Sequence, residues 1–159
     1  MIQIVKDADT RPWFFLQTAH TTYGMRVMET GHLEHLYYGE RITVDSQDPA
    51  SCAPLVIQRG FAPGNTCTYD REHPQISMED VCLEVGTLGK GDIREPFLEV
   101  RFADGSVTSD FTFDSYKIIT LKEREQCLQD SGLPHSYSEV ETDSAECLQI
   151  VLQDVTNHL

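Results

Sequence analysis

The sequence predicts an all-β protein, an antiparallel β-sandwich, and three observations support this fold class. Short segments that alternate apolar and polar residues recur along most of the chain, and turn residues such as Gly, Pro, Asn and Asp separate them. No long stretch shows the 3.6-residue periodicity of an amphipathic helix. With 159 residues, 40% of them hydrophobic, the chain is large enough to enclose the core of one domain.

The first predicted strands lie close together at the amino terminus. Apolar residues bounded by turn signals predict strands at 2–5 and 13–18, and residues 21–42 predict a β-hairpin that turns at 30–31. The second strand contains the only tryptophan, Trp13. We expect Trp13 to pack in the core or an interface, since that role is commoner for a tryptophan in a strand than a sugar-stacking platform.

The outgoing arm of the hairpin carries three polar residues, His32, Glu34 and His35, among apolar ones. If these residues are functional, they would form a metal site or an acid–base site. As a structural group they would line the polar edge of a sheet. The structural interpretation is favoured because no Cys or third ligand follows at zinc spacing. The sequence therefore predicts no metal site and no cofactor.

The composition changes between residues 45 and 80 to Pro, Gly, Ser, Asp and Asn, and only 55–57 resembles a strand. A stretch this long without its own periodicity is usually functional or disordered. Farther along, three glycines surround Lys90. Their spacing fits neither a P-loop nor a dinucleotide-binding fingerprint, so they predict a loop that needs a permissive backbone.

Strand signals return in the second half of the chain. Residues 97–102 and 107–113 predict a hairpin, because Asp104-Gly105 between them is a strong turn signal. Further strands are predicted at 116–121 and 145–152. Many short strands with turns between them, and few helical signals, are typical of two antiparallel sheets packed face to face.

The composition argues against several classes of function. The formal net charge of −14, from 26 acidic and 12 basic residues, disfavours nucleic acid and anionic membranes as partners, whereas an uncharged sugar stays compatible. The amino terminus is charged where a signal peptide would be apolar, and no apolar run reaches membrane-spanning length, so we expect a cytoplasmic location. The five cysteines are irregularly spaced, which predicts free thiols.

Six stretches of the chain form a pattern that is specific when they are taken together. They are TTYGMRVMETGHLEHLYYGERI at 21–42, RGFAP at 59–63, LEVGTLGKGDIREP at 83–96, ADGS at 103–106, GLP at 132–134 and ECLQIVLQDVT at 146–156. In this order they resemble the amino-terminal domain of the bacterial α-galactosidases of glycoside hydrolase family 36. The resemblance covers nearly the whole chain.

The resemblance implies a large, supersandwich-like β-sandwich that precedes a catalytic (β/α) barrel and a small carboxy-terminal β-domain. Residues 1–159 would then be an incomplete amino-terminal sandwich domain, without those later domains. The parent enzyme would hydrolyse terminal α-galactosides of the melibiose and raffinose type with retention, using two carboxyl groups ~5 Å apart. Both carboxyl groups belong to the barrel, so no catalytic residue is expected in this chain.

Several acidic residues of the chain are not assigned to that catalytic pair. Strand and loop spacing does not fix their separation, and carboxylates of an acidic protein are usually solvated. They are Asp92, Glu95, Glu139, Glu141, Asp143 and Glu146. For Asp92 and Arg94 we expect a role in shaping the glycine-rich loop, through hydrogen bonds to backbone groups.

The resemblance also implies a role for the loop-rich region 45–80. Many similar enzymes are tetramers in which a loop of the sandwich domain helps to form a neighbouring subunit's active site. Arg59 and Arg71 are the candidates for hydrogen bonds to sugar hydroxyls or to acidic groups across the interface. A solvated charge or a loop salt bridge stays open as their alternative role. The expected partners are a galactoside, the enzyme's own barrel and other copies of the chain.

Two further classes of function stay open. A free-standing carbohydrate-binding module would bind sugar through exposed aromatic residues such as Trp13, Tyr37 or Tyr38. A purely structural interaction domain would bind no sugar and would self-associate through an apolar face.

Overall fold

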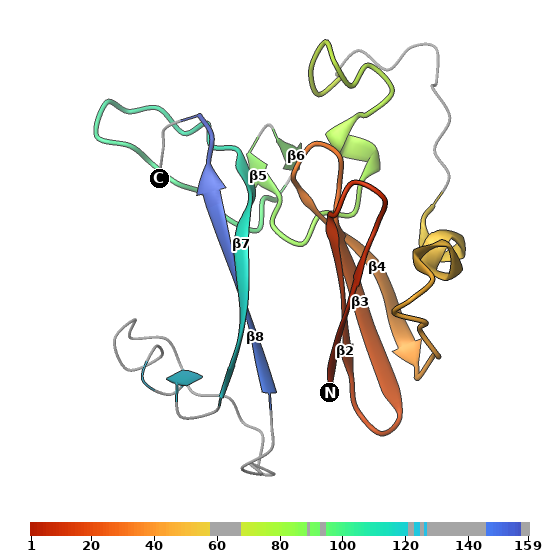
Figure 1. Ribbon diagram of the computed structural model, residues 1–159. Helices are drawn as coiled ribbons and strands as arrows, with labels where there is room; N and C mark the ends of the chain where they lie inside the picture. Colours follow the sequence, from red (N-terminus) through yellow and green to blue (C-terminus); the bar gives the residue numbers. More distant parts are fainter. Residues whose placement is uncertain are drawn as a thin grey trace.

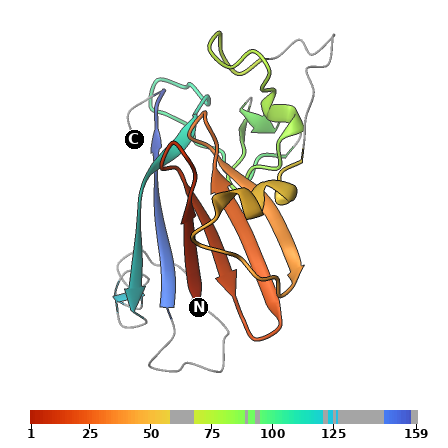
Figure 2. The same cartoon turned by 45° about the vertical axis from the view of Figure 1, so that its right-hand side comes forward.

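The computed structural model describes residues 1–57, 68–88, 90–92, 95–120, 123–124, 126 and 146–156. Two antiparallel sheets face each other (Figures 1 and 2): a four-stranded sheet in the order β1-β2-β3-β4 and a two-stranded ribbon of β7 and β8. The all-β, antiparallel, sandwich-like fold is therefore confirmed. No helix among the described residues has the length and apolar character to cross a lipid bilayer.

The four-stranded sheet is a meander of neighbouring strands. Its strands are β1 (Ile2–Lys6), β2 (Pro12–Gln17), β3 (Thr21–Val27) and β4 (Leu33–Glu40). This confirms the predicted strands and the hairpin at 21–42. The turn between β3 and β4 contains Gly31 at a φ of 83°, a left-handed conformation that glycine adopts without steric cost. The backbone N–H of Gly31 donates to the carbonyl of Met28 at 3.0 Å, which closes this turn.

The opposite sheet consists of β7 (Phe111–Thr120) and β8 (Glu146–Asp154). Residues 111–113 and 116–120 of the strands predicted at 107–113 and 116–121 lie in the single strand β7, which pairs with β8 and has a bulge between Phe113 and Ser115. The pairing places Tyr116 beside Ile150 and so brings the apolar residues of both strands to one face. The apolar face that β7 and β8 share packs against the four-stranded sheet, and this packing favours one continuous β7 over two separate strands.

The hairpin predicted between 97–102 and 107–113 is wrong, although its turn is present. The N–H of Phe102 donates to the carbonyl of Ser106 at 2.9 Å, and Gly105 has a φ of 88°. The flanking residues form no ladder with each other, and Leu98 makes only an isolated bridge to Thr87. Residues 111–113 pair with β8 instead, and this pairing buries apolar surface between the sheets, so the turn forms without a hairpin ladder.

Short elements complete the described structure. They are the 3₁₀ helices η1 (Pro49–Leu55) and η2 (Met78–Asp80) and the two-residue strands β5 (Thr87–Leu88) and β6 (Gly91–Asp92). The strand predicted at 55–57 is wrong, because Leu55 is the last residue of η1. Asp48 caps this helix by accepting a hydrogen bond from the N–H of Ala50 at 3.1 Å, and Pro49 fits its first turn.

Strand β2 contributes to apolar clusters on both faces of its sheet. On the outer face, Trp13 and Phe15 pack with Val5, Val44 and Cys52, and Cys52 comes from η1. Trp13 is only 6% exposed, so its predicted place in the core is confirmed. On the inner face, Phe14 packs with the ends of β3 and β4 and with residues of β7 and β8.

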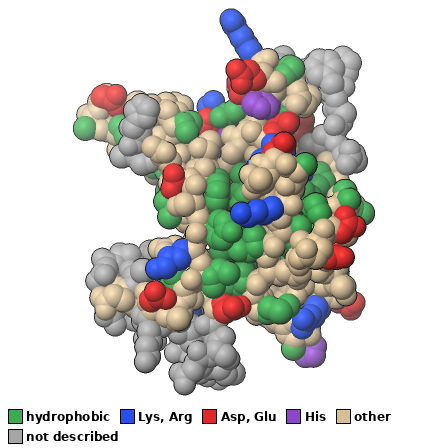
Figure 3. All heavy atoms as spheres, viewed as in Figure 1, with side chains coloured by type: hydrophobic (Ala, Val, Ile, Leu, Met, Phe, Trp, Pro, Cys, Tyr) green, Lys and Arg blue, Asp and Glu red, His purple; other side chains and the backbone are tan. Residues whose placement is uncertain are grey.

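The inner cluster is incompletely covered by the described residues. Figure 3 shows hydrophobic side chains gathered over the space between the two sheets. Eight residues packed against the buried inner cluster are only partly buried, namely Ile4, Leu16, Met25, Phe113, Tyr116, Leu148, Ile150 and Leu152. A two-stranded ribbon opposite a four-stranded sheet leaves part of the apolar inner face accessible.

Candidate functional site

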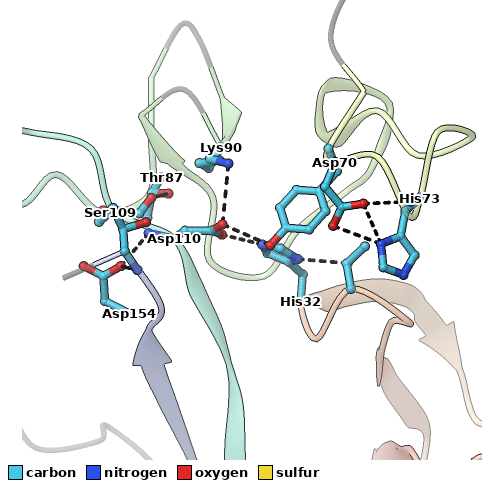
Figure 4. Close-up of polar contacts among 11 residues, drawn as sticks. His32, Asp70, His73, Thr87, Lys90, Ser109, Asp110 and Asp154 are labelled. Atoms are coloured by element: carbon cyan, nitrogen blue, oxygen red, sulfur yellow. Dashed lines mark hydrogen bonds and ion pairs between the residues drawn. The ribbon is translucent and has the colours of Figure 1, made fainter. Parts of the chain in front are cut away.

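A buried carboxylate, Asp110, lies directly before β7, where several distant segments of the chain meet (Figure 4). Its Oδ1 atom is 2.7 Å from Nε2 of His32, and its Oδ2 atom accepts a hydrogen bond from the hydroxyl of Tyr69 at 3.1 Å. The Nζ atom of Lys90 lies 3.6 Å from the same Oδ2 atom. These four residues, His32, Tyr69, Lys90 and Asp110, are named the Asp110 cluster.

Backbone contacts fix Asp110 at the end of the β7–β8 ribbon. Its N–H donates to Oδ1 of the buried Asp154 at 2.9 Å, and its carbonyl accepts from the N–H of Val155 at 2.9 Å. The preceding residue, Ser109, accepts a hydrogen bond at its carbonyl from the hydroxyl of Thr87 at 2.6 Å. The ribbon and β5 are therefore tied together beside the carboxylate.

His32 brings the opposite sheet to the same point. It lies in the turn between β3 and β4, and its Nδ1 atom is 2.9 Å from the hydroxyl of Thr30. An ionised carboxylate only accepts hydrogen bonds, so Nε2 of His32 carries the hydrogen that faces Asp110. The neighbouring carbonyl of Gly31 accepts from the N–H of Phe113 at 2.7 Å. The hairpin turn is thus docked on β7 by both side-chain and backbone contacts.

Tyr69 attaches a third segment, the loop of residues 68–76. Its ring packs edge-on against the ring of His32, with centroids 5.0 Å apart, and Nζ of Lys90 lies 5.0 Å from its centroid. A cation over an aromatic face is attracted by the ring's quadrupole. The loop therefore contacts the Asp110 cluster through the hydroxyl and the ring of one side chain.

The electrostatics of the cluster favour an ionised Asp110 and a neutral Tyr69. Burial acts to raise the pKa of Asp110, but hydrogen bonds and charge from His32, Lys90 and Tyr69 outweigh it and lower that pKa. Burial and the neighbouring carboxylate of Asp110 raise the pKa of Tyr69. At neutral pH the carboxylate therefore accepts and the phenol donates, which is the arrangement that the distances require.

The three polar residues of the hairpin have separate partners. His32 contacts Asp110, Glu34 accepts from Nε of Arg26 at 2.7 Å, and Nδ1 of His35 lies 3.0 Å from Oε1 of Glu84. Within the described ranges, no three His, Cys, Asp or Glu side chains are grouped to hold a metal ion. Each of the three side chains therefore joins its part of the hairpin to another residue: His32 to Asp110, Glu34 to Arg26 and His35 to Glu84.

Of the two arginines predicted to bind substrate, one is described. Arg71 is exposed on the loop of residues 68–76, two positions after Tyr69. Arg59 lies outside the described residues, as do Arg94 and the side chain of Asp92. The structure therefore places Arg71 on the loop that carries Tyr69 of the Asp110 cluster.

The other acidic candidates are also only partly described. Glu139, Glu141 and Asp143 lie outside the described residues, whereas Glu146 is exposed and accepts from the N–H of Ile2 at 2.9 Å. Glu95 is exposed and has an interaction partner. Among the described cysteines, Cys52, Cys82 and Cys147 are free thiols, as predicted.

A cavity of about 280 Å³ lies beside the end of this loop. It is lined by residues of the turn between β1 and β2, the end of β3 and the turn after it, the residues after η1, and the segment 75–81, namely Asp7, Arg11, Arg26, Val27, Met28, Glu29, Val56, Ile57, Gln75, Ile76, Ser77, Asp80 and Val81. Arg26 lies over the ring of Trp13, with Cζ 5.2 Å from its centroid. The sequence did not reveal this cavity, because its walls come from distant segments.

A family model and curated relatives agree on the kind of domain. The model described as the glycosyl hydrolase family 36 N-terminal domain matches residues 31–159. The bifunctional α-galactosidase/sucrose kinase AgaSK of Mediterraneibacter gnavus is 38% identical over 143 residues, which are 89% of this chain and 14% of that protein. The α-galactosidase AgaA of Geobacillus stearothermophilus is 31% identical over 141 residues, 89% of this chain and 18% of that protein.

Crystal structures extend the similarity to the fold. The α-galactosidase of Lactobacillus brevis aligns with a TM-score of 0.71 and 29% identity over 95% of this chain and 18% of that one. The galactosidase domain of AgaSK aligns with a TM-score of 0.71 and 30% identity over 97% of this chain and 20% of that one. The chain thus spans at most a fifth of these relatives. Because the family model covers most of its length, the chain belongs to the glycosyl hydrolase family 36 N-terminal domain family.

Proposed function

We propose that this chain is the non-catalytic amino-terminal domain of a larger α-galactosidase, which hydrolyses terminal α-galactosides with retention. The observation that carries the proposal is membership of the family 36 N-terminal domain family, together with the similarity to α-galactosidases. A structure of AgaA from Geobacillus stearothermophilus in complex with stachyose is 26% identical, with a TM-score of 0.70. A galactoside of the raffinose type is the substrate that this similarity favours.

The buried carboxylates of the described part support a non-catalytic role. Asp110 is bound by His32 and Tyr69, and Glu34 is bound by Arg26. Asp154 accepts from the backbone of Asp110. A retaining glycosidase needs two carboxyl groups ~5 Å apart that are free to attack the sugar and to donate a proton. These acidic side chains join segments of the scaffold, and the catalytic pair belongs to a later barrel domain.

The second part of the proposal concerns assembly. The domain docks on its own barrel and supports a cytoplasmic homotetramer, in which the loop region 45–80 reaches a neighbouring active site. Arg71 and Arg59 are the contact residues, since a guanidinium donates several hydrogen bonds to sugar hydroxyls or to carboxylates. The exposed position of Arg71 on a loop held by the Asp110 cluster supports this role.

A free-standing carbohydrate-binding module is less well supported. Such a module stacks sugars on exposed aromatic rings. Tyr38 is 70% exposed and meets this condition, but Trp13 is buried beneath Arg26. Tyr37 is only half-buried, and Tyr38 lies on the edge strand β4, so these two described residues provide little of the enclosed surface that a sugar site needs.

The absence of activity in the isolated chain is the first expected result. The measurement is release of nitrophenol from a chromogenic α-galactoside by this chain and by the parent protein that contains it. We expect turnover by the parent only, because the catalytic carboxyl groups lie outside these 159 residues. Turnover by the 159-residue chain itself would contradict the assignment, since the catalytic residues would then lie within it.

The role of Arg71 is tested by Arg71→Ala in the parent enzyme. We expect KM for raffinose to rise about tenfold with kcat nearly unchanged, because a lost charged hydrogen bond weakens binding in the ground state and the transition state alike. The matched control is Arg101→Ala, which removes another exposed arginine outside the loop region. Equal KM values for the two variants would rule out a specific contact by Arg71.

A further inference from the structure

We propose that the Asp110 cluster positions the loop of residues 68–76 for its work in the assembled enzyme, with the Tyr69 hydroxyl as the decisive link. This inference rests on the proposed function, because it names the residues that determine where Arg71 is presented. Asp110, His32 and Tyr69 act through the loop and touch no substrate, so they are positioning residues.

The loop is held together internally, so it can move as one unit. The N–H of Tyr69 donates to the carbonyl of Ile76 at 2.8 Å, which closes the loop at its base. Within the loop, Asp70 accepts from the N–H groups of Glu72 and His73 at 2.8 and 2.7 Å. Its carboxylate also lies 2.9 Å from Nδ1 of His73 (Figure 4). Arg71 is enclosed by these contacts along the chain, and its backbone follows any displacement of the loop.

Two side-chain hydrogen bonds connect this unit with other described residues, besides the ring contacts of Tyr69 with His32 and Lys90. The hydroxyl of Tyr69 donates to Asp110 in a partly buried site, whereas Nε2 of Gln75 donates to Glu29 at 2.9 Å in an exposed one. A hydrogen bond to a buried carboxylate is stronger than one between exposed side chains, where water competes. The Tyr69–Asp110 bond is therefore the stronger of the two, and Arg71 follows only two residues later.

The acceptor of this bond is itself rigid. Asp110 is 3% exposed and is held through its backbone by Asp154 at the end of the ribbon. Its side chain is held by His32 from the turn of the four-stranded sheet. Contacts from both sheets thus fix the carboxylate, and the hydrogen bond from Tyr69 fixes the loop to the carboxylate. A group fixed before binding loses less entropy on binding than a mobile one.

The test is Tyr69→Phe in the parent enzyme, which removes one oxygen and keeps the ring that contacts His32 and Lys90. We expect KM for raffinose to rise about threefold to tenfold while kcat stays within about twofold. Hydrogen exchange of the backbone amides of residues 70–76 should become faster in the same variant, since the loop loses its main tether. Exchange reports loop order directly and does not depend on activity.

The matched control is Tyr23→Phe. Tyr23 also donates its hydroxyl to a partly buried carboxylate, Oε2 of Glu84, at 2.5 Å, but this bond lies outside the loop. The same atom is therefore removed from the same kind of bond in the same domain. We expect the KM of this variant and its exchange in residues 70–76 to match those of the unmodified enzyme.

The outcomes separate this inference from the proposed role of Arg71. If Arg71→Ala raises KM but Tyr69→Phe changes neither KM nor exchange, positioning is overturned and the contact by Arg71 stands. If Tyr69→Phe changes both and Arg71→Ala changes nothing, positioning stands and another loop residue makes the contact. Faster exchange without a change in KM, or equal effects of Tyr69→Phe and Tyr23→Phe, would overturn positioning.

Discussion

Phe14→Ala is expected to lower the free energy of unfolding by about 3–5 kcal/mol, because it empties the centre of the inner cluster. Phe14 is 0% exposed, and its ring packs edge-on against Tyr116 with centroids 5.1 Å apart. It also contacts Phe113, so it joins β2 to the opposite ribbon. The loss is measured by urea unfolding of the chain, followed by the fluorescence of its only tryptophan, Trp13.

A matched substitution distinguishes this core effect from the general effect of losing a phenyl ring. Phe97 is 76% exposed, and Phe97→Ala is expected to change the free energy of unfolding by no more than about 0.5 kcal/mol. Equal losses for the two variants would show that the ribbon does not pack on the four-stranded sheet through Phe14.

Asp110→Ala is the other substitution with a large expected effect, about 3–5 kcal/mol of lost stability. It leaves His32 buried without its carboxylate and removes the acceptor of the Tyr69 hydroxyl. Asp110→Asn should cost less, since its amide oxygen can still accept one hydrogen bond. Asp114→Ala, at an exposed position in β7, is the control and should have little effect. Similar urea midpoints for Asp110→Ala and Asp114→Ala would contradict a structural role for the cluster.

The dependence of stability on pH provides a second measurement of what Asp110 contributes to the free energy of unfolding. The folded state lowers the pKa of Asp110 below the unfolded value of about 4. Its stabilising contribution is therefore complete above about pH 4 and is lost as the pH falls through the folded-state pKa. Unmodified protein should thus lose more stability in acid than Asp110→Asn, in which this group no longer titrates. Parallel pH profiles of the urea midpoint would show that Asp110 contributes nothing.

The four-stranded sheet could be predicted because its information is local. Alternating residues and short turns define β1 to β4, and each strand pairs with the next one in the chain. The ribbon was harder to predict. The Asp104-Gly105 signal describes a real turn, but the partner of β7 is chosen by the apolar face it shares with β8, far along the chain. Local signals do not encode that choice.

The Asp110 cluster shows the same limit for the candidate site. His32 was recognised as unusual because it stands among apolar residues, and Lys90 because glycines surround it. Neither pattern indicates Asp110, which is one of many acidic residues in the sequence and lies inside the strand predicted at 107–113. Arg71 was reached by resemblance, and only the structure connects its loop to the cluster. A site assembled from distant turns leaves no spacing motif.

The sequence separation within the Asp110 cluster has a consequence for folding kinetics. His32 and Asp110 are 78 positions apart, and Asp110 and Asp154 are 44 apart. Closing such long loops costs chain entropy before any contact can offset it, so we expect these bonds to form late, after the local pairs of the meander. Interactions absent from the folding transition state act mainly on the rate of unfolding. We therefore expect the cluster to affect the rate at which the two sheets separate on unfolding more than the rate at which they pack during folding.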